Sequence, residues 1–300
     1  MIRALLSNLH GAIAAIILVV YTLTVGVFLY LFIALRAVIR FRATRNFFQR
    51  ALAEVAIVWM AGIQWWMRTF HRTRWDIDGV GQLNPKGWYL VTANHQSWAD
   101  IFVLFRMYNR KIPLLKFFLK RDLMRVPVAG QAWWALDFPF MQRHSKSYLK
   151  KHPEKAGQDL EATKRACERF SETPTSVMNF IEGTRFSQEK HDQQNSPYKH
   201  LLKPKAGGLA FTIAALGTKF SALTNVTIAY PAGAPSFWDL MCGRMQEVIV
   251  RVEEIDIPAH FTKGDYQNDP SFRIEFQRWI SQMWERKDQL LDEILSSHPK

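Results

Sequence analysis

Residues 88–104 read WYLVTANHQSWADIFVL and decide how the chain should fold. Residues 88–92 are mostly aromatic or β-branched, which is typical of a buried strand. Residues 101–104 are apolar again and predict a helix over residues 97–108. Polar residues lie between the two runs, so a turn from strand to helix should present His95 to a cleft.

His95 and Asp100 are the candidate catalytic pair of this turn. A carboxylate about one helical turn after a histidine can approach one ring nitrogen and fix the tautomer, which leaves the other nitrogen as a general base. Ser97 and Asp100 also match a capping box, in which Asp100 would only bind backbone N–H groups. A metal site is less well supported, because no nearby His, Cys or Glu completes a ligand set.

The segments around this turn alternate between short apolar runs and charged helical stretches, which predicts an α/β fold. We expect a mixed, mostly parallel sheet flanked by helices, with an N-terminal membrane-anchoring helical segment. The other expected strands are 75–77, 176–181, 223–230 and 248–252, and the other expected helices are 154–171, 206–216 and 271–294. A long, polar, basic loop is expected over residues 184–205.

A second motif, Glu182-Gly183-Thr184-Arg185, follows the predicted strand 176–181. Glycine lets a ligand approach the backbone closely. An arginine guanidinium offers a planar set of donors suited to phosphate, and a threonine hydroxyl can add a hydrogen bond. Gly183, Thr184 and Arg185 are therefore candidate phosphate-binding residues. The alternative is an ordinary turn with a solvated arginine.

With both motifs in this order, the sequence resembles the lysophospholipid acyltransferase family, whose members carry N-H-x4-D and, further along, E-G-T-R. The resemblance runs from about residue 75 to residue 231. It includes Phe140 and Arg143, which resemble the family's F-x-x-R block, and Pro231, which resembles the proline of its fourth block. It implies an enzyme of the 1-acylglycerol-3-phosphate acyltransferase type, in a divergent bacterial inner-membrane subgroup.

The resemblance also implies residue roles. His95 would be the base and Asp100 its partner, Arg143 and Arg185 would bind the phosphate, and Glu182 would hold the acceptor site in shape. This sequence departs from the family at four positions. Asp137 stands where Gly is common, Met141 where Ile is common, Ile181 where Pro is common and Phe186 where Ser is common. None of these departures removes a catalytic atom, but they leave the acceptor headgroup open.

Residues 11–35 contain no charged residue and predict a membrane-anchoring helix. A helix of this length reaches roughly 37 Å, which exceeds the ~30 Å hydrocarbon core of a bilayer. The run is too long for an ordinary signal peptide. Five arginines follow it, whereas Arg3 alone precedes it, so the rest of the chain should face the cytoplasm.

Residues 51–67 are a second, shorter apolar segment that contains Glu54 and several tryptophans. Tryptophans beside basic residues are typical of the membrane interface, so an interfacial or re-entrant helix is expected, with a buried core helix as the alternative. The predicted domains are a membrane anchor over residues 1–70 and an acyltransferase domain over residues 71–300.

Composition narrows the possible partners. The 300 residues include 39 Lys and Arg against 26 Asp and Glu, so anionic partners are expected. The two cysteines suggest neither a disulfide framework nor a zinc site. A nucleic-acid binder is disfavoured because the basic residues are dispersed and no recognition motif is visible. A non-catalytic protein that binds anionic lipid is a remaining alternative.

The expected reaction is direct transfer of a fatty acyl group from acyl-CoA or acyl-carrier protein to the sn-2 hydroxyl of 1-acylglycerol-3-phosphate. The product would be phosphatidic acid. Another lysophospholipid, such as lysophosphatidylglycerol, is the alternative acceptor. No metal or redox cofactor is expected, and the partners would be the two substrates and membrane lipid. The basic residues 190, 191, 199, 203 and 205 could form a docking surface or be solvated loop charges.

Overall fold

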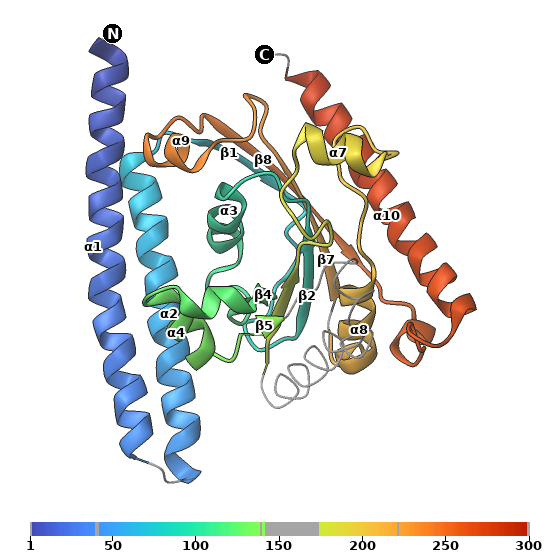
Figure 1. Cartoon of the computed structure of the whole chain (residues 1–300), viewed down its shortest axis with the longest axis horizontal. Helices are drawn as coiled ribbons and strands as arrows, with labels where there is room; N and C mark the ends of the chain where they lie inside the picture. The colour runs from blue at the N-terminus through green and yellow to red at the C-terminus, as the bar shows by residue number, and fades with distance from the viewer. Residues whose placement is uncertain (1, 40–41, 139, 142–173, 221, 299–300) are drawn as a thin grey trace.

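The computed structural model describes residues 2–39, 42–138, 140–141, 174–220 and 222–298 (Figure 1). A central sheet lies between two layers of helices, and a pair of long helices lies along one side. The predicted α/β class is therefore confirmed. The predicted helix over residues 154–171 lies outside the described residues.

The main sheet has six strands in the order β1-β8-β7-β2-β6-β3. All neighbouring pairs are parallel except β7 and β8, so the sheet is mixed and mostly parallel, as predicted. The strands are β1 (Arg74–Asp78), β2 (Tyr89–Ala93), β3 (Leu115–Phe117), β6 (Ser176–Asn179), β7 (Ala222–Ala229) and β8 (Glu247–Ile255). A separate parallel pair consists of β4 (Leu119–Lys120) and β5 (Phe140–Met141).

β2 lies inside the sheet, between β7 and β6, and every one of its residues is buried. Its side chains alternate between two apolar cores because successive strand residues point to opposite faces. Tyr89, Val91 and Ala93 belong to the core under the long helices, whereas Leu90 belongs to the core on the other face. This double burial explains why residues 88–92 form a continuous apolar run.

The first face of the sheet is covered by α1 (Ile2–Val38), α2 (Arg42–Phe70), α3 (Ala99–Tyr108) and α4 (Ala129–Ala135). The other face is covered by α8 (Gly207–Leu216) and α10 (Pro270–Ser297). Shorter helices are η1 (Arg121–Arg125), α7 (Gln188–Gln194), α9 (Phe237–Met241) and η3 (Ala259–Thr262). The predicted loop over residues 184–205 thus contains one helix, α7, whose first turn is capped by the Ser187 side chain.

α1 and α2 pack antiparallel along their lengths (Figure 1). Residues 51–67 are the middle of the continuous helix α2. The bonds between the helices run from Tyr21 Oη to Val58 O at 2.7 Å, from Trp59 Nε1 to Thr22 Oγ1 at 3.1 Å and from Trp66 Nε1 to Ala14 O at 2.8 Å. An interfacial position for the exposed face of α2 stays a prediction.

α1 is, among the described residues, the one helix long and apolar enough to cross a membrane. It also contacts the sheet domain near both of its ends. Arg244 donates to Asn8 Oδ1 at 2.7 Å, and Tyr30 Oη donates to Gln131 Oε1 of α4 at 3.1 Å. The remaining surface of α1 exposes a long series of large apolar side chains, from Ile2 to Val38.

Asp137 occupies a position where the family resemblance suggested glycine. Its φ of 58° lies in the left-handed region, which glycine adopts without strain and which aspartate tolerates better than most residues. Its carboxylate accepts a hydrogen bond from Gln49 Nε2 of α2 at 3.3 Å. The departure therefore preserves the turn and adds a contact to the helical pair.

Trp66 and Trp65 test the packing of α2 directly, because they are adjacent and oppositely exposed. Trp66 is 1% exposed, whereas Trp65 is 60% exposed. We predict that Trp66→Ala lowers the free energy of unfolding by roughly 3–5 kcal/mol, the usual cost of emptying a core tryptophan site. Trp65→Ala should change it little. Equal losses in detergent-solubilised protein, measured by thermal or denaturant unfolding, would contradict this packing.

Candidate active site

The candidate site begins where β2 ends, at Asn94 and His95. Asn94 is fully buried, and its side-chain amide pairs with the backbone of β7. Its Nδ2 donates to Ile228 O at 2.8 Å, and its Oδ1 accepts from Ile228 N at 2.8 Å. These two bonds replace strand pairing at the point where the chain leaves the sheet, so the turn that follows has a fixed position.

The predicted pair, His95 and Asp100, is assembled at this turn. His95 Nδ1 lies 2.8 Å from Asp100 Oδ2. The same oxygen accepts from the backbone N–H groups of Gln96 at 2.7 Å and Ser97 at 2.9 Å. The other oxygen, Oδ1, accepts from the hydroxyl of Tyr230 at 2.7 Å. Asp100 therefore supports the turn and also contacts the imidazole, which combines the two roles that the sequence left as alternatives.

This geometry fixes how the imidazole is oriented. Since an ionised carboxylate can only accept hydrogen bonds, the proton of neutral His95 lies on Nδ1 and leaves the Nε2 lone pair free. The His95 side chain keeps 16% of its exposure, whereas Asp100 is fully buried. The burial of Tyr230, reinforced by Asp100, raises the pKa of that phenol well above its ordinary value, so it stays a donor.

The second motif begins at the end of β6, beside β2 in the sheet. Phe180 stacks on the His95 ring, with centroids 4.0 Å apart and planes inclined by 15°. The backbone N–H of Phe186 donates to His95 O at 2.7 Å. The two predicted motifs, which lie more than eighty residues apart in sequence, are therefore in direct contact.

Glu182 is fully buried behind the His95 turn. Its Oε1 accepts from His95 N at 2.8 Å, and its Oε2 accepts from Leu202 N at 3.1 Å. Burial raises the pKa of Glu182 to about 7, while the two backbone N–H groups and the Lys287 ammonium oppose that rise. The carboxylate thus holds the peptide of His95 and does not face a ligand.

The remaining residues of this motif lie near the surface of the site. Gly183 has a φ of 72°, which favours glycine, and a Cβ there would lie 3.0 Å from Lys205 Nζ. Thr184 Oγ1 accepts from Lys190 Nζ at 3.0 Å. Arg185 is exposed, and its guanidinium lies 5.0 Å above the ring of Trp98 in a cation–π contact. Arg185 is therefore held near the His95 turn.

The basic residues around this motif are engaged with the chain itself. His191 Nε2 lies 2.6 Å from Tyr198 O, and Lys199 Nζ lies 2.5 Å from Asp292 Oδ1. These contacts favour intramolecular roles for His191 and Lys199 over an open docking surface.

Arg143, the other predicted phosphate ligand, lies outside the described residues. Phe140, from the same block, begins β5.

Three residues of the site were not singled out from the sequence. Phe180 and Tyr230 each lie next to a recognised motif, so their positions at strand ends could have indicated proximity to His95. Lys287 lies far from either motif in sequence, on α10, and nothing in its local sequence indicates that it is buried against the carbonyl of Val226 in β7.

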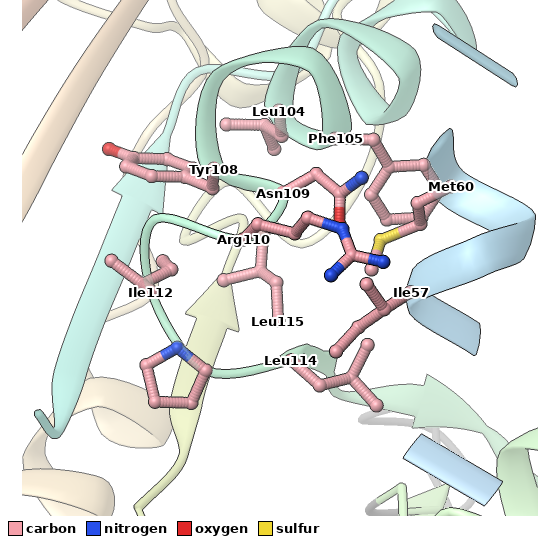
Figure 2. A pocket seen from close by; sticks show the side chains of 11 residues that line it. Ile57, Met60, Leu104, Phe105, Tyr108, Asn109, Arg110, Ile112, Leu114 and Leu115 are labelled. Carbon is pink, nitrogen blue, oxygen red and sulfur yellow. The ribbon is translucent and has the colours of Figure 1, made fainter. Parts of the chain in front are cut away.

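An apolar pocket lies between α2, α3 and the segment that enters β3 (Figure 2). Its lining residues include Ile57, Met60, Leu104, Phe105 and Leu115. A series of aromatic contacts joins the pocket wall to the site. The centroid distances are 6.0 Å from Phe105 to Phe117, 6.2 Å from Phe117 to Phe180 and 4.0 Å from Phe180 to His95.

A family model described as Acyltransferase matches residues 74–230, which is just over half of the chain and includes both motifs. The chain belongs to the Acyltransferase family. The family resemblance predicted from the sequence is thereby confirmed.

Curated relatives include proteins named as 1-acyl-sn-glycerol-3-phosphate acyltransferases. The chain is 23% identical to a probable enzyme of this type, number 5, from Arabidopsis thaliana, with 69% of this chain and 54% of the relative covered. It is also 23% identical to the 1-acyl-sn-glycerol-3-phosphate acyltransferase gamma from Mus musculus, with 76% of this chain and 58% of the relative covered. A 2-acyl-1-lysophosphatidylinositol acyltransferase from Saccharomyces cerevisiae is 23% identical as well, with 69% of this chain and 62% of the relative covered.

The acyltransferase chain spans a little over half the length of these relatives. Among solved structures, it resembles the crystal structure of PlsC, the 1-acyl-sn-glycerophosphate acyltransferase from Thermotoga maritima. The TM-score is 0.57 at 18% identity, and 97% of each chain is covered. At this identity the likeness is one of fold, and it extends over the two N-terminal helices.

Tyr230→Phe tests the contact that orients Asp100. Phenylalanine fills the same space but leaves one buried carboxylate oxygen without its hydroxyl donor. We predict a loss of about 1–3 kcal/mol in the free energy of unfolding. Tyr266→Phe, whose hydroxyl accepts an exposed contact from Gln277, is the matched control and should be nearly neutral. Similar losses for both variants in denaturant unfolding would refute the role of Tyr230.

Proposed function

We propose that the chain transfers a fatty acyl group from acyl-CoA or acyl-carrier protein to the sn-2 hydroxyl of 1-acylglycerol-3-phosphate, forming phosphatidic acid. The observation that carries the proposal is the His95–Asp100 pair, whose Nδ1 to Oδ2 distance of 2.8 Å leaves Nε2 available as a base. Membership of the Acyltransferase family and the names of the relatives support the reaction class.

In the proposed step, His95 Nε2 accepts the proton of the lysolipid hydroxyl as its oxygen attacks the thioester carbonyl. The new carbon–oxygen bond forms an ester as the carbon–sulfur bond breaks. The His95 imidazolium then gives its proton to the departing thiolate, so that a free thiol leaves and His95 is neutral again. Asp100 stabilises the imidazolium between these events because its carboxylate faces Nδ1. The transfer is direct and requires no metal or redox cofactor.

Arg185 is the proposed ligand of the acceptor phosphate, together with Arg143. The stacking of the Arg185 guanidinium on Trp98 supports this role, because it holds an exposed cation close to the His95 turn. Thr184 would complete the clamp once Lys190, which now donates to its hydroxyl, turns toward the phosphate. Gly183 and Glu182 shape the loop that carries these groups.

The acyl chain is proposed to follow the aromatic side chains that lead from His95 toward the apolar pocket. Phe180, Phe117 and Phe105 offer an apolar surface in that direction. Phe105 also lines the pocket, whose wall is mostly apolar and includes the polar side chains of Asn109 and Arg110 (Figure 2). A thioester carbonyl beside Nε2 would then have its hydrocarbon chain directed toward α2 and α3.

The proposed location is the inner membrane, with the catalytic domain, residues 71–300, on the cytoplasmic side and residues 1–70 as the anchor. The exposed apolar face of α1 supports membrane contact, since an apolar surface of this size on a folded chain marks an interaction site. Phe237 and Trp238 of α9 are also about half exposed, next to the N-terminal part of α1. The partners are therefore membrane lipid and the two substrates.

His95→Ala should lower the transfer rate by at least about 10²–10⁴-fold, the range that general-base catalysis supplies. Membranes that contain the wild type or the variant receive oleoyl-CoA and a panel of lysolipids, and the products are identified by mass spectrometry. The panel includes lysophosphatidate, lysophosphatidylglycerol and lysophosphatidylinositol. Activity that survives His95→Ala would overturn the mechanism, and a product other than phosphatidic acid would reassign the acceptor.

Arg185→Ala should chiefly weaken acceptor binding. Loss of a charge-assisted contact worth about 1.5–3 kcal/mol raises KM for the lysolipid by roughly 10- to 100-fold and changes kcat less. Arg278→Ala, an exposed arginine on α10, is the charge-matched control. An unchanged KM in Arg185→Ala would remove this residue from the acceptor site.

The non-catalytic alternative makes the opposite prediction in the same assay. A protein that only binds anionic lipid would acylate no lysolipid with either donor, and its vesicle binding would be insensitive to His95→Ala.

A further inference from the structure

One face of the His95 imidazole is covered by the ring of Phe180. The two ring centroids lie 4.0 Å apart and the ring planes are inclined by only 15°, so the rings are stacked face to face. His95 lies just beyond the end of β2, and Phe180 directly follows β6, which is the neighbour of β2 in the sheet. The stack is therefore a contact between the two motifs that involves the proposed base itself.

Phe180 is held by the sheet and by the turn that follows it. Thr92 Oγ1 of β2 donates to Asn179 O at 3.0 Å, which ties the last residue of β6 to its neighbouring strand. Phe180 O accepts from Gly183 N at 2.8 Å, which closes the turn of the second motif. The Phe180 ring also lies nearly parallel to the buried ring of Phe117 in β3, with centroids 6.2 Å apart. The aromatic face over His95 thus has a defined position.

The stack constrains the imidazole in a way that its hydrogen bond does not. The contact from Nδ1 to Asp100 Oδ2 fixes one edge of the ring. A parallel ring at 4.0 Å restricts the tilt of the imidazole plane. The lone pair of Nε2 lies in that plane, so the plane sets the direction from which Nε2 can accept a proton.

Phe180 also presents the negative face of its π-system to a ring that becomes positively charged. In the proposed step His95 passes from imidazole to imidazolium, and a cation above an aromatic face is stabilised electrostatically. A neutral imidazole gains less from the same contact. The stack is therefore stronger after proton transfer than before it, which is the condition for an interaction to accelerate a reaction.

We propose that Phe180 is a positioning residue of the acyl transfer, which fixes the plane of the His95 imidazole and stabilises the imidazolium that forms on it. The inference rests on the role proposed for His95 and deepens it. It gives the residue that precedes the second motif a part in the chemistry of the first.

Phe180→Leu is the principal test, because leucine keeps apolar bulk over the imidazole and removes the aromatic face. The charged and titratable groups around the turn stay in place, and they are Asp100, Glu182, Arg185 and Tyr230. ¹⁵N NMR of the full chain in detergent follows protonation of the His95 ring itself, separately from that of Glu182. The pH of half-protonation should fall by about half a unit, since a cation–π contact near the surface changes an equilibrium by roughly two- to fivefold.

The kinetics should change for the same reason. In Phe180→Leu the kcat for acyl transfer should fall by about two- to tenfold, because the imidazolium forms less readily. The KM for the lysolipid should change less. Phe180→Tyr keeps the aromatic face and should restore both kcat and the pH of half-protonation. Phe211→Leu alters another half-buried phenylalanine, which contacts Tyr266 far along the chain, and should change neither value.

The inference is overturned if Phe180→Leu leaves the half-protonation pH of His95 unchanged, whatever happens to kcat. Should that variant fail to fold, replacing Phe180 by pentafluorophenylalanine keeps the shape of the ring and reverses the charge distribution of its face. A fall in the half-protonation pH then supports the proposal, and an unchanged value refutes it. A wild type that acylates no lysolipid but shows the NMR shift would contradict the proposed function and leave the contact of Phe180 with the imidazolium standing.

Discussion

The carboxylate of Asp100 is fully buried and accepts four hydrogen bonds from two separate parts of the chain. Two come from the backbone of the turn, one from the His95 ring and one from the Tyr230 hydroxyl at the end of β7. A buried charge is costly unless such donors surround it. This constraint forces the turn, the imidazole and the neighbouring strand end into one arrangement.

A second buried carboxylate, Glu182, repeats this design at the end of β6. It fixes the peptide of His95 from behind, while Asp100 fixes its ring from the side. Both carboxylates act on the residue that leaves β2, and β2 is held by apolar cores on both faces. The sheet therefore fixes the end of β2, and the two carboxylates fix the peptide and the ring of His95 relative to it. Together these contacts give Nε2 a defined position.

The sequence was sufficient to predict this part of the molecule because its signals are local. A run of aromatic and β-branched residues, a turn and a carboxylate one helical turn later indicate a buried strand and the pair His95 and Asp100. The alternating apolar and charged segments around them indicate the fold class. Contacts between distant segments could not be predicted in the same way. Lys287 reaches the backbone of Val226 in β7 only through the packing of α10 on the sheet, and Trp66 is buried only because α1 lies beside α2.

The helical pair illustrates the same distinction. An uncharged run of 25 residues predicts an apolar helix over residues 11–35, and α1 is such a helix. Its contacts with Arg244 near one end and with Gln131 of α4 near the other depend on residues far along the chain. The apolar helix therefore contributes to the core of the domain and leaves a large apolar outer face exposed.

The most direct test of the account is ¹⁵N NMR of the His95 side chain in the full chain, assigned by comparison with His95→Gln. We predict that neutral His95 carries its proton on Nδ1, bonded to Asp100, and that Nε2 is unprotonated. The same signal in Asp100→Asn should lose this tautomer preference. A proton found on Nε2 of the wild type would contradict the claim that Asp100 prepares this nitrogen to act as a base.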